Sequence, residues 1–175
     1  SAEATPTVVM TVREFHVLDR SIQAAGVEAM TVEDIRWGRC DIKSVNLLAN
    51  VLARQQVKQA RVFEAILVRA GLVTEGAVSN VMIIQRGAVV TAPEGPRILS
   101  GVTRAMVLNL ALREGLPVQE RFVAQADLYD AEEVFLTGTT VEVLAVVRID
   151  GKVIGNGRPG PITQRLAARF TKQVD

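Results

Sequence analysis

The spacing of hydrophobic and polar residues changes along the chain, and each change marks an expected element. Alternating or β-branched stretches predict strands, at residues 7–13, 28–35, 62–69, 78–85, 88–91, 118–123, 133–137 and 142–149. The first of these stretches also fits an extended linker. Apolar residues at helical spacing predict helices, at about residues 44–60, 102–113 and 160–172. Residues 21–26 fit neither period.

The expected helices have recognisable ends and apolar faces. Ser44 is expected to cap the first helix, Gly115 to end the second in a left-handed conformation, and Pro161 to lie in the first turn of the third. The stripe of the first helix consists of Leu48, Val51, Leu52 and Gln55. The apolar face of the second helix consists of Val102, Met106, Val107 and Leu110.

Glycine-containing pairs separate neighbouring strands and predict tight turns. Ala70-Gly71 follows one strand, Arg86-Gly87 separates two strands as in a hairpin, and Asp150-Gly151 follows the last strand. Strands and helices do not alternate regularly, which favours the α+β class. We therefore expect a mixed, largely antiparallel sheet with packed helices.

Composition narrows the classes of function. The chain has 175 residues, of which 49% are hydrophobic, enough for one domain with a sizeable core. Lys plus Arg total 20 and Asp plus Glu total 19, so the formal charge of +1 indicates no nucleic-acid or membrane-surface partner. No apolar run approaches the roughly 20 residues of a membrane-spanning helix. The single cysteine, Cys40, fits a reducing compartment, and we expect a cytoplasmic protein.

Two ionisable residues are candidates for catalysis. Lys43 lies where an extended segment gives way to a helix, a position from which a side chain can enter a pocket. Burial there would favour the neutral amine, which is a nucleophile toward an aldehyde, although most lysines are simply solvated. Glu75 precedes a strand and could face a cationic ring nitrogen, although it also fits an ordinary turn residue.

Two polar turns are candidates for binding an anion. Residues 100–104 open a helix, whose free backbone N–H groups and dipole suit a phosphate, with the Thr103 hydroxyl nearby. Residues 138–140 (Gly-Thr-Thr) place two hydroxyls between strands. Helix capping and a locally bonded turn are the alternative explanations. His16 is the only histidine, so a catalytic triad or a His-based cluster is hard to build, and we expect no metal site.

Four sequence blocks together resemble one enzyme family. Residues 33–48 (EDIRWGRCDIKSVNLL) resemble the lysine region of bacterial D-amino acid aminotransferases, which belong to the class IV pyridoxal-phosphate-dependent aminotransferases. Residues 73–81 (VTEGAVSNV) resemble the segment that faces the pyridine nitrogen. Residues 99–104 (LSGVTR) and 135–142 (FLTGTTVE) resemble the two phosphate-binding turns. The blocks occur in the order and at the spacing of the family.

The resemblance implies the large domain of an enzyme that uses pyridoxal 5'-phosphate to transaminate amino acids to 2-oxo acids. Lys43 would form the Schiff base with the cofactor and later move the substrate proton. Glu75 would pair with the protonated pyridine nitrogen and keep the ring an electron sink. Arg36 would lie near the cofactor and support the lysine segment. The implied substrates are D-amino acids such as D-alanine, with 2-oxoglutarate as the acceptor.

The resemblance also implies contacts to the rest of the cofactor. The backbone N–H groups of Val102 and Thr103, with the Thr103 hydroxyl, would hold the phosphate from one turn. Thr139 would hold it from the other turn, and Leu99 would pack on a ring face. The family often has serines at the positions of residues 77–78 (Ala-Val), so fewer hydrogen bonds are expected around the cofactor.

The family organisation implied by the resemblance is larger than this chain. Residues 1–18 are expected to form a linker from an N-terminal domain, and residues 19–175 the cofactor-binding domain. In the family, the N-terminal domain supplies a phosphate-binding arginine, an active-site tyrosine and groups that grip the substrate carboxylate. We therefore expect a fragment with little activity alone. The full-length protein is expected to be a homodimer with amino acids and 2-oxo acids as its small-molecule partners.

Three alternatives remain open. A branched-chain aminotransferase belongs to the same superfamily, but it usually has a glycine- and asparagine-rich stretch after its lysine, unlike residues 41–48 (DIKSVNLL). An aminodeoxychorismate lyase has the same fold, but its pattern is less like residues 36–40. A non-catalytic binding or dimerisation domain could also keep the fold, although Lys43 and Glu75 are both present.

Overall fold

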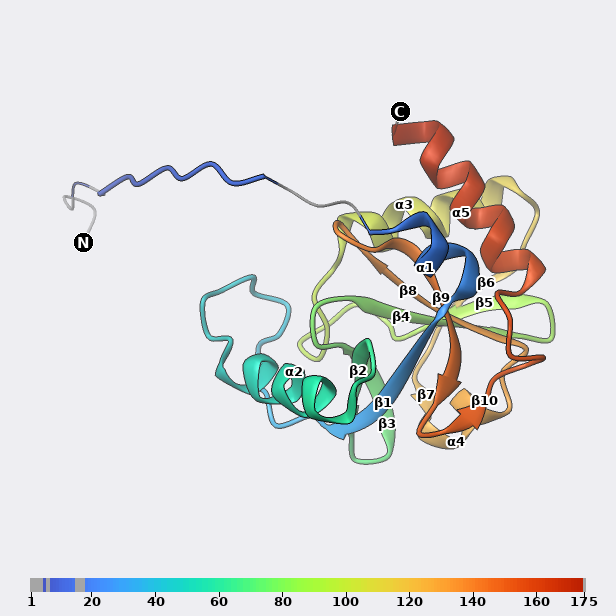
Figure 1. Ribbon diagram of the computed structural model, residues 1–175, viewed down its shortest axis with the longest axis horizontal. Helices are drawn as coiled ribbons and strands as arrows, with labels where there is room; N and C mark the ends of the chain where they lie inside the picture. The colour runs from blue at the N-terminus through green and yellow to red at the C-terminus, as the bar shows by residue number, and fades with distance from the viewer. Residues whose placement is uncertain (1–4, 6, 15–17, 175) are drawn as a thin grey trace.

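The computed structural model of the protein describes residues 5, 7–14 and 18–174 (Figure 1). Its helices are α1 (Arg20–Ala25), α2 (Leu48–Ala60), α3 (Val102–Arg113), α4 (Gln125–Tyr129) and α5 (Pro161–Val174). Its strands are β1 (Val27–Glu33), β2 (Glu64–Arg69), β3 (Leu72–Gly76), β4 (Asn80–Gln85), β5 (Ala88–Thr91), β6 (Val118–Glu120), β7 (Val123–Ala124), β8 (Glu133–Gly138), β9 (Glu142–Ile149) and β10 (Lys152–Val153). Within these residues, no helix combines the length and apolar character needed to cross a membrane.

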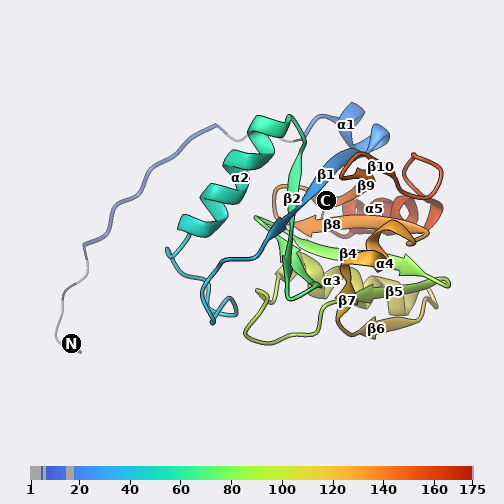
Figure 2. The same cartoon turned by 90° about the horizontal axis from the view of Figure 1, so that it is seen from below.

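One mixed sheet runs through the molecule in the order β6-β5-β4-β8-β9-β1-β2-β3-β7, with β10 paired to β9. Strand β1 is parallel to β2 and β9, and β5 is parallel to β6, while the other six described pairings are antiparallel. In Figure 2, β1 and β2 run steeply across the direction of β4, β5 and β8, so the sheet is strongly twisted. The expected α+β class and the mixed, largely antiparallel sheet are confirmed.

Apolar side chains pack on both faces of the central strands, because alternate residues of a strand point to opposite faces. On one face, Met82 and Phe135 pack in a cluster with residues of α3 and α5. On the other face, Ile83 and Leu136 belong to the core enclosed by the sheet. Figure 1 shows α3 and α5 together on one side of the molecule, with α2 on another side beside β1 and β2.

Several local predictions are confirmed, because backbone chemistry alone decides them. Helix α3 spans the expected residues, and Gly115 after it has a φ of 74°, a left-handed conformation that suits glycine. Pro161 is the first residue of α5, where its missing N–H costs no hydrogen bond. Arg86 and Gly87, between β4 and β5, have φ values of 52° and 71°, as a tight hairpin turn requires.

The predicted start of the first long helix is wrong. Helix α2 begins at Leu48, and its N-cap residue, Leu47, makes no side-chain capping bond. The Ser44 hydroxyl accepts a hydrogen bond from the backbone N–H of Asn46 at 3.2 Å. This serine therefore orders the loop before the helix, a local use of serine that competes with capping.

The apolar stripe predicted for α2 does not face the core. The buried residues of the helix are Ala53 and Val57. Leu48, Val51 and Leu52 are 70%, 59% and 47% exposed. Ala53 and Val57 thus face β1 and β2, while Leu48, Val51 and Leu52 form an apolar strip on the surface.

Short elements account for the other differences. Residues 7–14 form no strand, and the strand expected at 118–123 is two short strands, β6 and β7. Strand β3 and helix α4 are additional, and residues 21–26 lie largely in helix α1. Val102 is 77% exposed at the start of α3, whereas Val107 and Leu110 of the predicted face are buried.

Candidate functional site

A cavity of about 520 Å³ lies between the loop before α2, the β3–β4 turn, the start of α3 and the β8–β9 turn. Its volume lies within the range of roughly 300–1,000 Å³ found for small-molecule sites. Its lining includes every site residue predicted from the sequence, namely Arg36, Lys43, Glu75, Leu99, Val102, Thr103 and Thr139. These residues come from four separate segments, so the tertiary fold brings them together.

Glu75 lies near the end of β3 and is only 5% exposed. Its Oε1 accepts a hydrogen bond from Arg36, and its Oε2 accepts one from Asn80 Nδ2 and one from the backbone N–H of Leu99, both at 3.0 Å. A carboxylate has about four acceptor positions, so one remains for a further donor. Burial raises the pKa of Glu75, and the attraction of Arg36 opposes that shift.

Arg36 is held against Glu75 by a second carboxylate, Asp34. The Arg36 Nε and Nη2 atoms donate to the two oxygens of Asp34, each at 2.9 Å, in the bidentate geometry that suits this pair. Burial opposes ionisation of Asp34, but the bonds and charge of Arg36 and a bond from Thr74 outweigh it and hold the pKa at about 2. Burial lowers the pKa of Arg36, but the hydrogen bonds and negative charges of Asp34 and Glu75 outweigh it and raise the pKa, so this side chain stays a fixed cation beside Glu75.

Lys43 lies in the loop before α2, among the residues that line the cavity. Its side chain is exposed in the described structure, so the burial that would favour a neutral amine is not present there. The loop itself is anchored by backbone contacts: Cys40 N–H donates to the carbonyl of Pro96 at 2.8 Å, and Arg69 donates to the carbonyl of Arg36 at 2.8 Å. The amine therefore lies on an anchored segment at the cavity wall.

The start of α3 offers free backbone donors to the cavity. Its N-cap residue is Gly101, and no side chain caps this end, so capping by Ser100 or Thr103 does not explain the motif. A Cβ atom added at Gly101 would overlap Asn80 Oδ1, so only glycine fits this close approach. The uncapped N–H groups and the helix dipole suit an anion at this end of the cavity.

The β8–β9 turn faces the same end of the cavity. Thr139 is exposed in the turn, and both it and Gly138 line the cavity. Thr137, in the strand before the turn, is fully buried and lines the cavity too. The cavity can therefore bind an anion between the two polar turns. Glu75 can bind a cationic N–H group, and the amine of Lys43 lies on the cavity wall.

Sequence reasoning missed three residues of the site, Asp34, Asn80 and Thr137. Asn80 is buried and joins Glu75 to the carbonyl of Leu99, with Nδ2 donating at 3.0 and 2.9 Å. A polar residue at the start of a continuously apolar strand was the available signal for Asn80. Asp34 precedes Arg36 by two positions, a spacing that has no meaning until the loop geometry is known. His16 lies outside the described residues.

Comparison with known proteins shows one family across most of the chain. The family model for class IV amino-transferases matches residues 1–149. A D-alanine aminotransferase of Bacillus licheniformis is 49% identical over 152 residues, which are 87% of this chain and 54% of that protein. The D-alanine aminotransferase of Staphylococcus haemolyticus is 45% identical over 86% of this chain and 53% of its own length. The chain thus spans about half the length of the curated relatives that it matches.

Solved structures give the same result at the level of the fold. The branched-chain amino acid aminotransferase of Thermobaculum terrenum, in its PLP-form (holo-form), superposes with a TM-score of 0.81 at 28% identity, over 90% of this chain and 54% of that chain. The branched-chain amino acid aminotransferase of Escherichia coli gives a TM-score of 0.75 at 30% identity, over 84% of this chain and 52% of that chain. From its sequence, its fold and these relatives, the chain belongs to the class IV aminotransferase family.

Proposed function

We propose that the protein binds pyridoxal 5'-phosphate through Lys43 and serves the transfer of amino groups from D-amino acids to 2-oxo acids. One observation carries the proposal: a single cavity is lined by an amine, a buried carboxylate and an uncapped helix start. The likeness to D-alanine aminotransferases supports the reaction class. The PLP-form of the Thermobaculum terrenum relative supports the cofactor.

The donor set of the cavity fits the two charged ends of such a cofactor. The N–H groups of Val102 and Thr103, with the Thr103 hydroxyl and Thr139, would hold the phosphate at the start of α3. Glu75, with one acceptor position free, would accept the N–H of the ring nitrogen. Leu99, which is half-buried beside Glu75, would cover a face of the ring.

Each charged side chain then has a separate task. When bound, pyridoxal 5'-phosphate supplies an electron sink for negative charge that develops at the amino acid Cα. Arg36, fixed by Asp34, favours the ionised form of Glu75 against the effect of burial, so Glu75 can keep a proton on the ring nitrogen. The Lys43 amine would hold the cofactor aldehyde and, once released by the substrate, take the proton from Cα and return it as a general acid–base.

Lys43→Ala tests the attachment of the cofactor. Wild-type protein mixed with pyridoxal 5'-phosphate should develop a visible absorption band, and borohydride reduction should leave the cofactor mass on the peptide that contains Lys43. The band and the added mass should be absent from Lys43→Ala. Lys58→Ala, a change at an exposed lysine of α2, should behave like wild type. Labelling of another lysine at equal yield in wild-type protein would contradict the proposal.

The identity of the substrate has a second candidate. Branched-chain L-amino acids are favoured by the structural likeness to branched-chain aminotransferases, whereas the higher sequence identities are to D-alanine aminotransferases. Mixing the cofactor-loaded protein separately with D-alanine and L-leucine, without a 2-oxo acid, distinguishes the two. The faster loss of the visible band with D-alanine is the expected result.

We also propose that the protein assembles as a homodimer. The apolar strip of α2, formed by Leu48, Val51 and Leu52, is continuous in sequence with the exposed Val45 and Leu47. Large exposed apolar patches are typical of protein interfaces. We propose that a second copy of the chain covers this strip, because most soluble oligomers are symmetric homo-oligomers and dimers are the commonest.

A further inference from the structure

Thr137 has a buried hydroxyl that the described residues leave without a hydrogen-bond partner. The residue is 0% exposed, it lies in β8, and its Oγ1 makes no hydrogen bond. Comparable buried threonines do find acceptors: Thr91 Oγ1 donates to the carbonyl of Val81 at 2.7 Å, and Thr163 Oγ1 donates to Glu133 at 2.6 Å. An unpaired buried hydroxyl is unfavourable, so this exception needs an explanation.

The strand pairing places Thr137 beside the start of α3. Thr137 and Asn80 are direct partners in the antiparallel pair of β8 and β4, so their side chains share a face of the sheet. It is the face on which Phe135 packs with α3, since residues two apart in a strand point the same way. Asn80 lies so close to Gly101, the N-cap of α3, that no Cβ fits between them. The Thr137 hydroxyl thus belongs to the inner end of the anion-binding part of the cavity.

Few groups of the chain near the Thr137 hydroxyl are free to accept a hydrogen bond from it. Among the described residues that line the cavity, only Glu75 has a carboxylate. Arg36, Asn80 and Leu99 already donate hydrogen bonds to it. The start of α3 adds backbone N–H donors, the Thr103 hydroxyl and, beside Gly101, the amide oxygen of Asn80, and none of them makes a hydrogen bond with the Thr137 hydroxyl. A ligand oxygen that carries negative charge would accept from both the N–H groups and the hydroxyl.

We propose that the Thr137 hydroxyl is a further ligand of the phosphate group that binds at the start of α3, beneath the β8–β9 turn. The inference rests on the proposed function, because it deepens the anion site of that cavity. It predicts that Thr137 stabilises the bound phosphate while it weakens the ligand-free fold. A threonine that only filled space would have neither effect.

Thr137→Val tests this, because valine keeps the shape and removes the hydroxyl. The expected result is a dissociation constant for pyridoxal 5'-phosphate that is about tenfold or more higher than in wild type. Pyridoxal, which lacks the phosphate, should attach to Lys43 equally well in both proteins. The ligand-free variant should melt at the same temperature as wild type or higher, since an unpaired polar group has been removed. Thr137→Ser, which keeps the hydroxyl, should restore most of the affinity.

Thr91→Val is the matched control, because Thr91 is equally buried but bonds to Val81 on β4 and does not line the cavity. This variant should melt at a lower temperature and bind the cofactor like wild type. Unchanged affinity of Thr137→Val for pyridoxal 5'-phosphate, or a lower melting temperature without ligand, would overturn the role of Thr137 and leave the proposed function intact. If wild-type protein binds neither pyridoxal 5'-phosphate nor inorganic phosphate, the proposed function itself fails.

Discussion

Protonation of Asp34 at acid pH should lower the stability of the fold. Its pKa of about 2 lies below the ordinary value of 3.8, because Arg36 and Thr74 favour its ionised form against burial. Such a group adds stability that is fully present above its unfolded pKa and is lost as the pH falls from about 4 toward 2. Asp34→Asn should therefore lower the free energy of unfolding by about 2 kcal/mol at pH 7 and by much less near pH 2.

Urea unfolding of the ligand-free protein at several pH values measures this difference. Asp41→Asn is the control, because Asp41 forms an exposed pair with Arg39 at 2.8 Å, and its loss should change stability little. Equal stability of Asp34→Asn and wild type at neutral pH would show that Asp34 does not hold Arg36 as described.

The ionisation of Glu75 should make the affinity for the cofactor depend on pH. Burial raises its pKa above the ordinary 4.5, and the ionised form is the stronger acceptor for the N–H of a cationic ring, because opposite charges then pair. Affinity for pyridoxal 5'-phosphate should therefore fall as the pH is lowered through this raised pKa. The fall should begin at a higher pH than it would if Glu75 had the ordinary pKa of a glutamate. Titrations of the cofactor at a series of pH values should show this fall in wild type and a flatter profile in Glu75→Gln. An identical profile in the variant would contradict the role of Glu75.

Among the elements, α5 packs on the sheet through apolar side chains, and one buried carboxylate of the sheet binds its first turn. Glu133, the first residue of β8, accepts hydrogen bonds from the backbone N–H groups of Ile162 and Thr163 at 3.0 and 2.7 Å, and from the Thr163 hydroxyl at 2.6 Å. It thereby satisfies N–H groups that a helix start leaves free. Glu133→Ala should lower the free energy of unfolding by about 2–3 kcal/mol, measured by urea unfolding.

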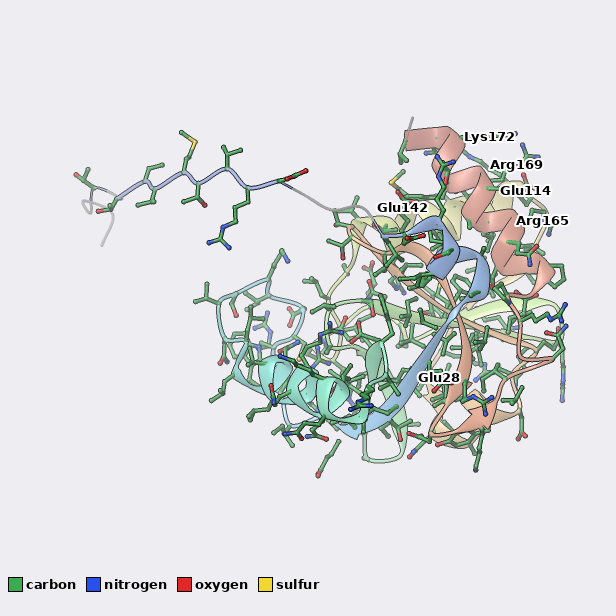
Figure 3. All side chains as sticks on the ribbon, viewed as in Figure 1. Glu28, Glu114, Glu142, Arg165, Arg169 and Lys172 are labelled. Carbon is green, nitrogen blue, oxygen red and sulfur yellow. The ribbon has the colours of Figure 1, made fainter. Side chains whose placement is uncertain are left out.

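An exposed ion pair of α5 supplies the control for Glu133. Figure 3 shows Glu114 beside Arg165 and Arg169 of α5, and the nearest ion pair, to Arg169, is 2.8 Å long. These arginines are about half exposed, so the pair contributes at most about 1 kcal/mol. Glu114→Ala should therefore cost much less than Glu133→Ala, and a reversed order would contradict the role given to Glu133.

Elements were predictable from the sequence where backbone chemistry or long periodicity decided them. The bounds of helix α3 are correct, and Gly115 after its end has the left-handed conformation that suits glycine there. Its apolar face was the weaker signal, because Val102 is exposed and Arg104 is buried. Helix α2 has a regular apolar stripe, but the stripe faces outward because Ala53 and Val57 form the packed side. Periodicity locates an apolar face and does not say whether the domain itself or another molecule covers it.

At the scale of the molecule, the four segments of the site could be found only through resemblance to a family. Lys43, Glu75 and the two polar turns each have an ordinary explanation when taken singly. The network around them depends on contacts such as Arg36 to Glu75 and Asn80 to Leu99, which join residues far apart in the sequence. Local spacing carries no information on such contacts, so Asp34 and Thr137 became visible only in the structure, and for Asn80 the sequence offered only a polar residue at the start of an apolar strand.

At the surface of the molecule, the proposed dimer rests on the apolar strip of α2. Helix α2, which carries the apolar strip, lies away from α3 and α5 (Figure 1), and Leu48 in the strip is 70% exposed. If a second copy covers the strip, a charge at position 48 must be buried without a partner, which is strongly unfavourable at an interface. Leu48→Glu should therefore raise the dimer dissociation constant at least about a hundredfold in sedimentation equilibrium. Leu112→Glu, which changes a 59% exposed leucine of α3, should leave the dimer intact. A wild-type protein that remains monomeric at high concentration, or a Leu48→Glu dimer as tight as wild type, would require another occupant for this surface.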